Sequence, residues 1–166
     1  MLPPEKLLRL QREQHHHDNR NHSDIVHLHK TDRLKHYGLH FAKYVGRLAR
    51  STDESKTVER TIVDTLLVSL SAANTLHQNL ANERASAQPR GNQMDPLYTF
   101  ADAAGRFADA CEKIDHAEEY VSIARRANCD IVHWVIAFAR DRQFKLEPAI
   151  QIRRKELAER QFYISD

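Results

Sequence analysis

The stretch Asp130-Ile-Val-His-Trp-Val-Ile-Ala-Phe-Ala139 decides the expected fold of this chain. It opens on an aspartate and contains one further strongly polar residue, His133. A segment that is apolar on nearly every side is typical of a helix buried in a helical bundle, and this one is too short to span a bilayer. A second stretch of the same kind runs from Asp64 to Ala73.

Asp64 and Asp130 lie 66 residues apart, and the same offset aligns other residues without a gap. Identical pairs include Phe41 with Phe107, Ala42 with Ala108, Ala73 with Ala139 and Leu80 with Leu146. We interpret residues 38–80 and 104–146 as two diverged copies of one helical hairpin. The alternative is a chance match between amphipathic helices that share one period.

Composition and apolar pattern predict an all-α protein, a bundle of about five helices built from the two hairpins. The helices are expected at about residues 24–50, 57–80, 96–125 and 126–142, and the last begins at Glu147. The 166 residues include only four glycines and five prolines, and no run alternates as a strand would. Lys and Arg number 25 against 23 Asp and Glu, which gives no overall drive towards nucleic acid or a membrane. Two cysteines in apolar settings and the lack of a secretory signal indicate a cytoplasmic protein. A homo-oligomer is compatible with such a bundle.

The expected organisation is a polar N-terminal arm followed by a single bundle. The arm covers residues 1–24, and six histidines lie between His15 and His29. Such a run can bind a transition metal weakly, but a solvated and mobile arm is the favoured expectation. The bundle covers 25–166, with copy 1 at about 25–80, a linker at 81–95 and copy 2 at about 96–163. Pro89 and Gly91 mark the linker.

The segment Leu39-His-Phe-Ala-Lys-Tyr-Val-Gly-Arg-Leu-Ala49 resembles the second helix of the MazG-like all-α nucleotide pyrophosphohydrolases, whose pattern is close to Leu-x-x-Ala-Lys-Glu-Val-Gly-Glu-Leu. The stretches that begin at Asp64 and Asp130 resemble that family's third helix, and residues 150–163 resemble its last helix. The resemblance covers roughly residues 34–80 and 104–163. Since the family builds its bundle from two chains, two copies in one chain imply a pseudo-dimer.

The resemblance implies hydrolysis of nucleoside triphosphates to monophosphate and pyrophosphate. The family holds Mg²⁺ with four carboxylates, paired at i, i+3 on two successive helices, because residues at that spacing share a helix face. Magnesium prefers oxygen ligands and orients the attacking water. The implied cofactor is therefore Mg²⁺ or Mn²⁺, and the implied ligand is a nucleotide or another phosphorylated small molecule.

This chain departs from the family at most of those acids. The four positions are Tyr44, Arg47, Thr61 and Asp64 in copy 1, and Ala110, Lys113, Ala127 and Asp130 in copy 2. Only the two aspartates can serve as metal ligands of the family type. Two functions remain open: a pyrophosphohydrolase relative with an altered metal site, or a non-catalytic binding, regulatory or structural protein that has kept the bundle.

Two clusters are candidate sites. His36, His40, Lys43 and Arg47 form a stripe along one helix, where cations could hold a phosphate or nucleotide directly. The alternative is a solvated basic face. The second cluster, a relocated carboxylate–histidine metal site, would use Glu112, Asp115, Asp130 and His133, with Asp64 as the remaining candidate ligand. Its alternative is surface charge beside a structural Asp–His pair. Either way, Asp130 should have a partner, because a buried unpaired carboxylate is costly.

Overall fold

In a computed structural model, residues 2–86 and 95–160 are described, and within them the chain is helical, which confirms the all-α class. No helix in these ranges is long and apolar enough to cross a membrane. The helices are α1 (Pro4–Asn21), α2 (Ser23–Val26), α3 (Lys30–Arg50), α4 (Val58–Thr75), α5 (Leu80–Ser86), α6 (Pro96–Asp115), α7 (Val121–Asp141) and α8 (Leu146–Ala158), with a short 3-10 turn, η1 (Ser51–Asp53).

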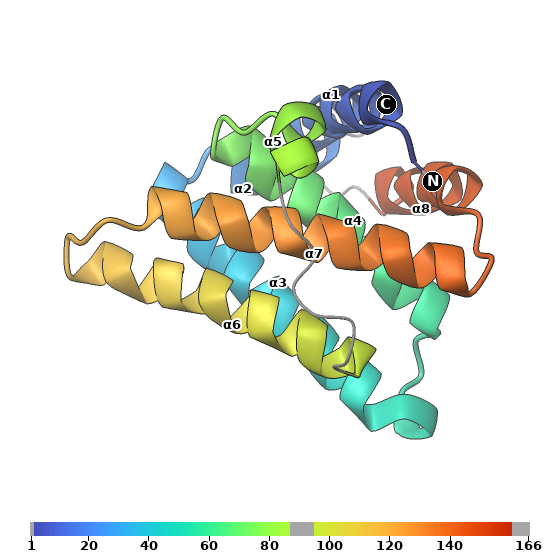
Figure 1. The fold of residues 1–166 in the computed structure, drawn as a ribbon. Coiled ribbons are helices and arrows are strands. Elements are labelled where there is room, and N and C mark those ends of the chain that lie inside the picture. Colours follow the sequence, from blue (N-terminus) through green and yellow to red (C-terminus); the bar gives the residue numbers. More distant parts are fainter. Residues whose placement is uncertain (1, 87–94, 161–166) are drawn as a thin grey trace.

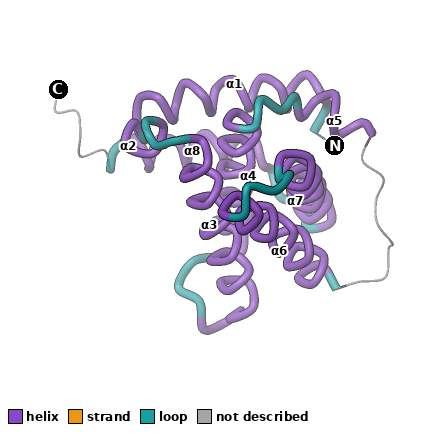
Figure 2. Tube along the Cα trace, turned by 90° about the vertical axis from the view of Figure 1, so that its left-hand side faces the viewer, coloured by secondary structure: helices purple, strands orange, loops and turns teal. Residues whose placement is uncertain are grey.

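Helices α3, α4, α6 and α7 form the central bundle (Figure 1). Helix α6 contacts α3 and α7, and α4 contacts the same two helices from the other side. Figure 2 shows α1 lying across this bundle, where it packs on α4 and α5, and α8 packs on α4 and α1. Phe41, Phe100, Phe107, Leu66 and Leu70 are fully buried at the centre.

The start of α6 follows directly from its sequence. The Asp95 carboxylate accepts a hydrogen bond from the Leu97 N–H at 2.7 Å, and Pro96 occupies the first turn. Trp134 of α7 then fixes this end of α6, since its indole N–H donates to the Pro96 carbonyl at 2.6 Å. Its ring also stacks on Phe100, with centroids 4.4 Å apart. Trp134 is therefore a core residue that joins the two helices.

The described residues form eight α-helices where about five were expected, because the long predicted helices are interrupted. The first, predicted from residue 24 to 50, is broken between α2 and α3. The second, predicted from 57 to 80, ends at Thr75, and α5 extends into the predicted linker. The third, predicted to reach residue 125, ends at Asp115. Residues 87–94 of the predicted linker lie outside the described residues.

The N-terminal segment differs most from expectation, because residues 4–21 form a packed helix and not a solvated arm. Leu7 and Leu10 are fully buried. The rest of the inward face of α1 is polar, and several of its side chains are hydrogen-bonded: the Gln11 amide donates to the Gln78 carbonyl at 2.6 Å and to Asn74 Oδ1 at 3.2 Å. Buried amides are tolerated when they are paired in this way.

Arg154 ties α8 to α1. Its side chain is 8% exposed, and it donates to Glu13 Oε2 at 2.7 Å, to the Leu10 carbonyl at 2.8 Å and to Gln14 Oε1 at 3.0 Å. Lys6 adds a salt bridge to Glu147 at 2.8 Å. The two terminal helices are thus joined mainly by polar contacts.

Four residues other than glycine have positive φ among those described: Ser51, His77, Ala117 and Gln143, with φ between 51° and 55°. They fall into two pairs that are each 66 residues apart. Ser51 and Ala117 come just after α3 and α6, while His77 and Gln143 come just after α4 and α7. The turns at His77 and Ala117 interrupt predicted helices, whereas those at Ser51 and Gln143 directly follow the helix ends predicted at residues 50 and 142. None of the four positions is a glycine.

The Ala117 turn yields a stability prediction. Ala117→Gly should stabilise the protein by roughly 0.5–1 kcal/mol, because a left-handed conformation is strained for alanine and free for glycine. Ala108→Gly is the matched control, since Ala108 is also exposed but lies inside α6, where glycine costs about 1 kcal/mol. Urea unfolding of both variants measures the two signs. A destabilised Ala117→Gly variant would contradict the left-handed turn.

Candidate functional site

A cavity of about 200 Å³ lies between α1, α2, α3, α4 and α8. Part of its wall is apolar and includes Ile25, Val26, Leu67, Val68 and Leu157. The remaining wall is polar or charged and comprises Gln14, Asp18, His22, His36, Tyr37, His40, Lys43, Tyr44, Arg47, Asp64, Ser71 and Arg153. A mixed lining of this kind suits a small molecule that carries both an apolar and a charged part.

The basic stripe of α3 faces this cavity. His36, His40, Lys43 and Arg47 all line it, because successive turns of one helix bring residues at this spacing to the same side. The stripe is therefore not simply a solvated face of the helix. Tyr44 joins the same group, with its ring centroid 5.1 Å from Lys43 Nζ and 5.4 Å from the central guanidinium carbon of Arg47.

The two histidines form a hydrogen-bonded pair. His40 Nε2 lies 3.1 Å from His36 Nε2, and His40 Nδ1 lies 3.0 Å from both the Tyr44 hydroxyl and Lys43 Nζ. Burial, followed by the charge of Lys43, lowers the pKa of His40 to about 3. Burial and Lys43 also lower the pKa of His36. Both imidazoles are thus neutral at pH 7.

Asp64 is the buried anion at the other side of Tyr44. It is 7% exposed, and its carboxylate accepts from Arg153 Nε at 2.7 Å and from Arg47 Nη1 at 3.5 Å. Burial and the charge of Asp64 raise the pKa of Tyr44, so its hydroxyl keeps its proton. Arg153 also contacts Glu156 at 3.0 Å.

Positive charge is in excess at this end of the cavity. Lys43, Arg47 and Arg153 meet there with Asp64 as the lining carboxylate. Asp18, the second carboxylate of the cavity, belongs to α1. It accepts hydrogen bonds from Ser71 Oγ at 2.6 Å and from Gln14 Nε2 at 2.8 Å. Burial raises the pKa of Asp18, which favours its neutral form. The cavity therefore favours an anion over a metal cation.

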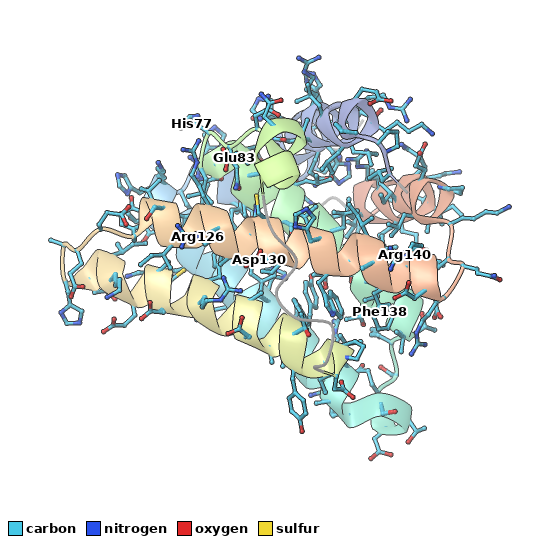
Figure 3. The ribbon with its side chains drawn as sticks, in the orientation of Figure 1. His77, Glu83, Arg126, Asp130, Phe138 and Arg140 are labelled. Carbon is cyan, nitrogen blue, oxygen red and sulfur yellow. The ribbon has the colours of Figure 1, made fainter. Side chains whose placement is uncertain are left out.

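The predicted carboxylate–histidine metal cluster is not assembled, because each acid is paired with a protein cation or a histidine. Glu112 contacts His116 on its own helix at 2.9 Å, and Asp115 forms a short ion pair with Lys35 of α3. Asp130, on the face of α7 near α6 (Figure 3), contacts Arg106 at 2.8 Å. Within the described ranges, no group of three or more His, Cys, Asp or Glu residues is placed to hold a metal ion. Asp64 lies in the cavity, and His133 also makes an interaction of its own.

Several cavity residues were not singled out from the sequence. Arg153 belongs to a segment whose charge pattern resembled the family's last helix, but its partner Asp64 could not be inferred. Gln14 and Asp18 were missed because α1 was expected to be a solvated arm. The signal was present in the helical spacing of Leu7, Gln14 and Asp18, which places all three on one face of α1.

No protein-family model matches the sequence, and comparisons with curated proteins and with solved structures find no match. The function is therefore argued from the cavity and its chemistry. The cavity combines a pair of neutral histidines with three cations and two buried carboxylates, Asp18 and Asp64.

The depressed pKa of His40 predicts acid sensitivity. A histidine whose folded pKa lies below its unfolded value of about 6.5 contributes stability above pH 6.5. That stability is lost as pH falls towards 3, the folded-state value. Between pH 7.5 and 5, the wild type should lose roughly 1–2 kcal/mol more than His40→Gln, which cannot titrate. Urea unfolding at both pH values measures the difference. Equal losses in the two proteins would show that His40 titrates normally.

The Asp130–Arg106 contact predicts a structural role for Asp130. Asp130→Ala should lower the free energy of unfolding by about 1 kcal/mol, because the pair is only partly buried. Asp109→Ala on the exposed face of α6 is the control and should change stability by less than about 0.5 kcal/mol. Thermal melts with and without Mn²⁺ test the alternative. A metal site is indicated if Asp130→Asn is more stable than wild type and loses a Mn²⁺ response that the wild type has.

Proposed function

We propose that this protein binds a nucleoside phosphate, or a related phosphorylated small molecule, in the cavity between α1, α3, α4 and α8, without a metal held by carboxylates. The observation that carries the proposal is the meeting of Lys43, Arg47 and Arg153 at one end of the cavity, where Asp64 is the lining carboxylate. Glu156 also contacts Arg153 at 3.0 Å, so three cations face two carboxylates and one positive charge remains for a ligand to neutralise. Guanidinium groups suit phosphate oxygens, because they offer several N–H donors in one plane.

The guanidinium of Arg47 is already ordered by protein contacts and still has N–H groups to donate to a ligand. Its side chain is 17% exposed, and its central carbon lies 5.4 Å from the centroid of the Tyr44 ring. One of its nitrogens points to Asp64 at 3.5 Å, which leaves other N–H groups to donate. A cation that is already ordered loses little side-chain entropy when it binds an anion.

The apolar part of the cavity wall suits the part of the ligand that carries no phosphate. Leu67, Val68 and Leu157 also line the cavity. A base or another apolar moiety could bury its surface there, while the phosphate lies at the cationic end. Inorganic phosphate would use only the cationic end, so a larger phosphorylated ligand should bind more tightly.

The residues that replace the family's acids support binding in preference to metal-dependent hydrolysis. Under the MazG-like resemblance, Tyr44 and Arg47 occupy positions of metal-binding glutamates, and both line the cavity with Asp64. In this chain the carboxylate of Asp64 is neutralised by Arg47 and Arg153. A fixed protein cation therefore takes the electrostatic role of the metal, but it cannot carry and activate a water molecule as a metal does.

We also propose that residues 38–80 and 104–146 are diverged copies that form a pseudo-dimer of MazG-like units. The paired left-handed turns, each 66 residues apart, support this proposal. A second support is the contact between Phe41 and Phe107, whose rings meet edge to face with centroids 5.0 Å apart. These two residues are also 66 apart, and a residue touches its own equivalent where a two-fold axis passes.

The residues of copy 2 favour a single ligand-binding site per chain, in copy 1. The copy 2 positions that correspond to Tyr44 and Thr61 are Ala110 and Ala127, and both are buried. The position that corresponds to Arg47 is Lys113, which pairs with Glu118 at 2.8 Å at the surface. Alanines and a surface lysine supply no arrangement like the cationic end of the cavity.

Calorimetric titration of the full chain tests the proposed ligand. We expect nucleoside monophosphates and triphosphates to bind in the presence of a chelator, with affinity that falls as ionic strength rises. Arg47→Met should weaken binding at least tenfold, or about 1.4 kcal/mol. Lys113→Met is the matched control because it removes the cation at the corresponding position of copy 2, and it should bind as the wild type does.

A pyrophosphate-release assay with Mg²⁺ and Mn²⁺ separates the two functions that the sequence left open. Binding without metal and no release support the proposal. Release that depends on Mg²⁺ or Mn²⁺ would favour the hydrolase, with its metal held by ligands other than the family's acids. Equal affinity of wild type and Arg47→Met would place the ligand elsewhere.

A further inference from the structure

Lys43 is the lysine that lines the cavity, within the part of the chain that the structure describes, and its amine has unusual surroundings. Its Nζ lies 3.0 Å from His40 Nδ1, so its hydrogen-bond partner is a neutral imidazole. Other lysines pair with carboxylates: Lys6 with Glu147, Lys35 with Asp115 and Lys113 with Glu118. A carboxylate partner stabilises the charged ammonium form of a lysine, whereas a neutral imidazole stabilises that form much less.

The cations of the cavity also act on this amine. Burial and the charge of Arg47 lower the pKa of Lys43. A lysine amine attacks a carbonyl carbon only in its neutral form, and partial burial beside another cation is a known way to make that form accessible. Lys43 therefore combines access to a cavity with a reduced tendency to stay protonated.

The hydrogen bonds define a route for the proton of Lys43. An ammonium can only donate, so His40 Nδ1 must accept, and His40 carries its own proton on Nε2. That proton points to His36 Nε2 at 3.1 Å, which must then be an acceptor. A proton taken from Lys43 at Nδ1 can therefore be replaced by one passed from His40 to His36.

We propose that Lys43 forms an imine with an aldehyde or ketone that carries a phosphate or carboxylate group, with the anionic group held by Arg47 and Arg153. The inference rests on the proposed anion-binding function and adds a covalent step to it. The cationic end of the cavity selects the anionic group, and the neighbouring amine captures the carbonyl carbon of the same molecule.

The step balances without an oxidant or a reductant. Lys43 first gives one proton through His40 to His36, and its neutral nitrogen then forms a bond to the carbonyl carbon. The carbonyl oxygen takes a proton from the attacking nitrogen, which gives a carbinolamine. The proton on His36 returns through His40 to the hydroxyl group, which leaves as water. The products are one water molecule and a protonated imine on Lys43.

Reductive trapping on the full chain tests this inference. The probes are pyridoxal 5′-phosphate, an aldehyde that carries a phosphate, and pyridoxal, which lacks it. Borohydride converts any imine into a stable adduct that peptide mass spectrometry assigns to a residue. We expect the phosphorylated probe to modify Lys43 at least tenfold more than any other lysine, and inorganic phosphate to reduce that modification.

Variants identify the residue and the proton route. Lys43→Arg keeps the charge but should remove the selective adduct, whereas Lys35→Arg, on another face of α3, should retain it. His40→Gln should slow adduct formation about tenfold while the final yield stays the same. Arg47→Met should reduce trapping of the phosphorylated probe more than trapping of pyridoxal, because pyridoxal loses only the effect of Arg47 on the pKa of Lys43.

The possible failures are distinguishable. If inorganic phosphate binds in calorimetry but the adduct spreads evenly over the exposed lysines, the imine is overturned and the anion-binding function stands. If phosphate does not bind and both probes modify Lys43 alike, the anion-binding function fails, and with it the proposed selection of an anionic carbonyl compound. Selective trapping that persists in Lys43→Arg would also overturn the assignment to Lys43.

Discussion

A carboxylate buried among helices has to be matched by positive charge, and much of this molecule's functional surface follows from that requirement at Asp64. The matching cations are Arg153 of α8 and Arg47 of α3, so one charge cluster joins α4 to two other helices. The same cluster orients two guanidinium groups along the cavity. Under the proposed function, structural pairing and ligand recognition use the same atoms, and those atoms are ordered before any ligand arrives.

The parts of the fold that could be predicted are those carried by local pattern. The all-α class follows from apolar periodicity, and the start of α6 follows from Asp95 and Pro96. Two interruptions could not be predicted, because the left-handed turns at His77 and Ala117 carry no glycine, whereas the end of α7 before Gln143 was predicted. Helix α1 was misjudged for a related reason: its inward face is polar, so periodicity of apolar residues understates its burial.

The candidate site also has one part that the sequence predicts and another part that it does not. Residues of the basic stripe lie on one helix, and spacing alone brings them to one face. The pairing of Arg153 with Asp64 spans 89 residues of sequence, and no local pattern predicts it. The pairing of the metal-cluster acids is non-local in the same way, since Lys35 reaches Asp115 and Arg106 reaches Asp130 from neighbouring helices. Spacing shows which side chains share a face but not which opposite charge meets them.

The polar junction between α1 and α8 has a consequence for how the molecule is assembled. Lys6 and Glu147 are 141 residues apart in the chain, as are Glu13 and Arg154, so these contacts close a loop that is nearly as long as the protein. During synthesis, the central hairpins can pair while α1 still lacks its C-terminal partner. Because Arg153 and Leu157 belong to α8, the wall of the cavity is completed only after α8 has been made and has packed on α4. A chain truncated before α8 would lack this part of the wall.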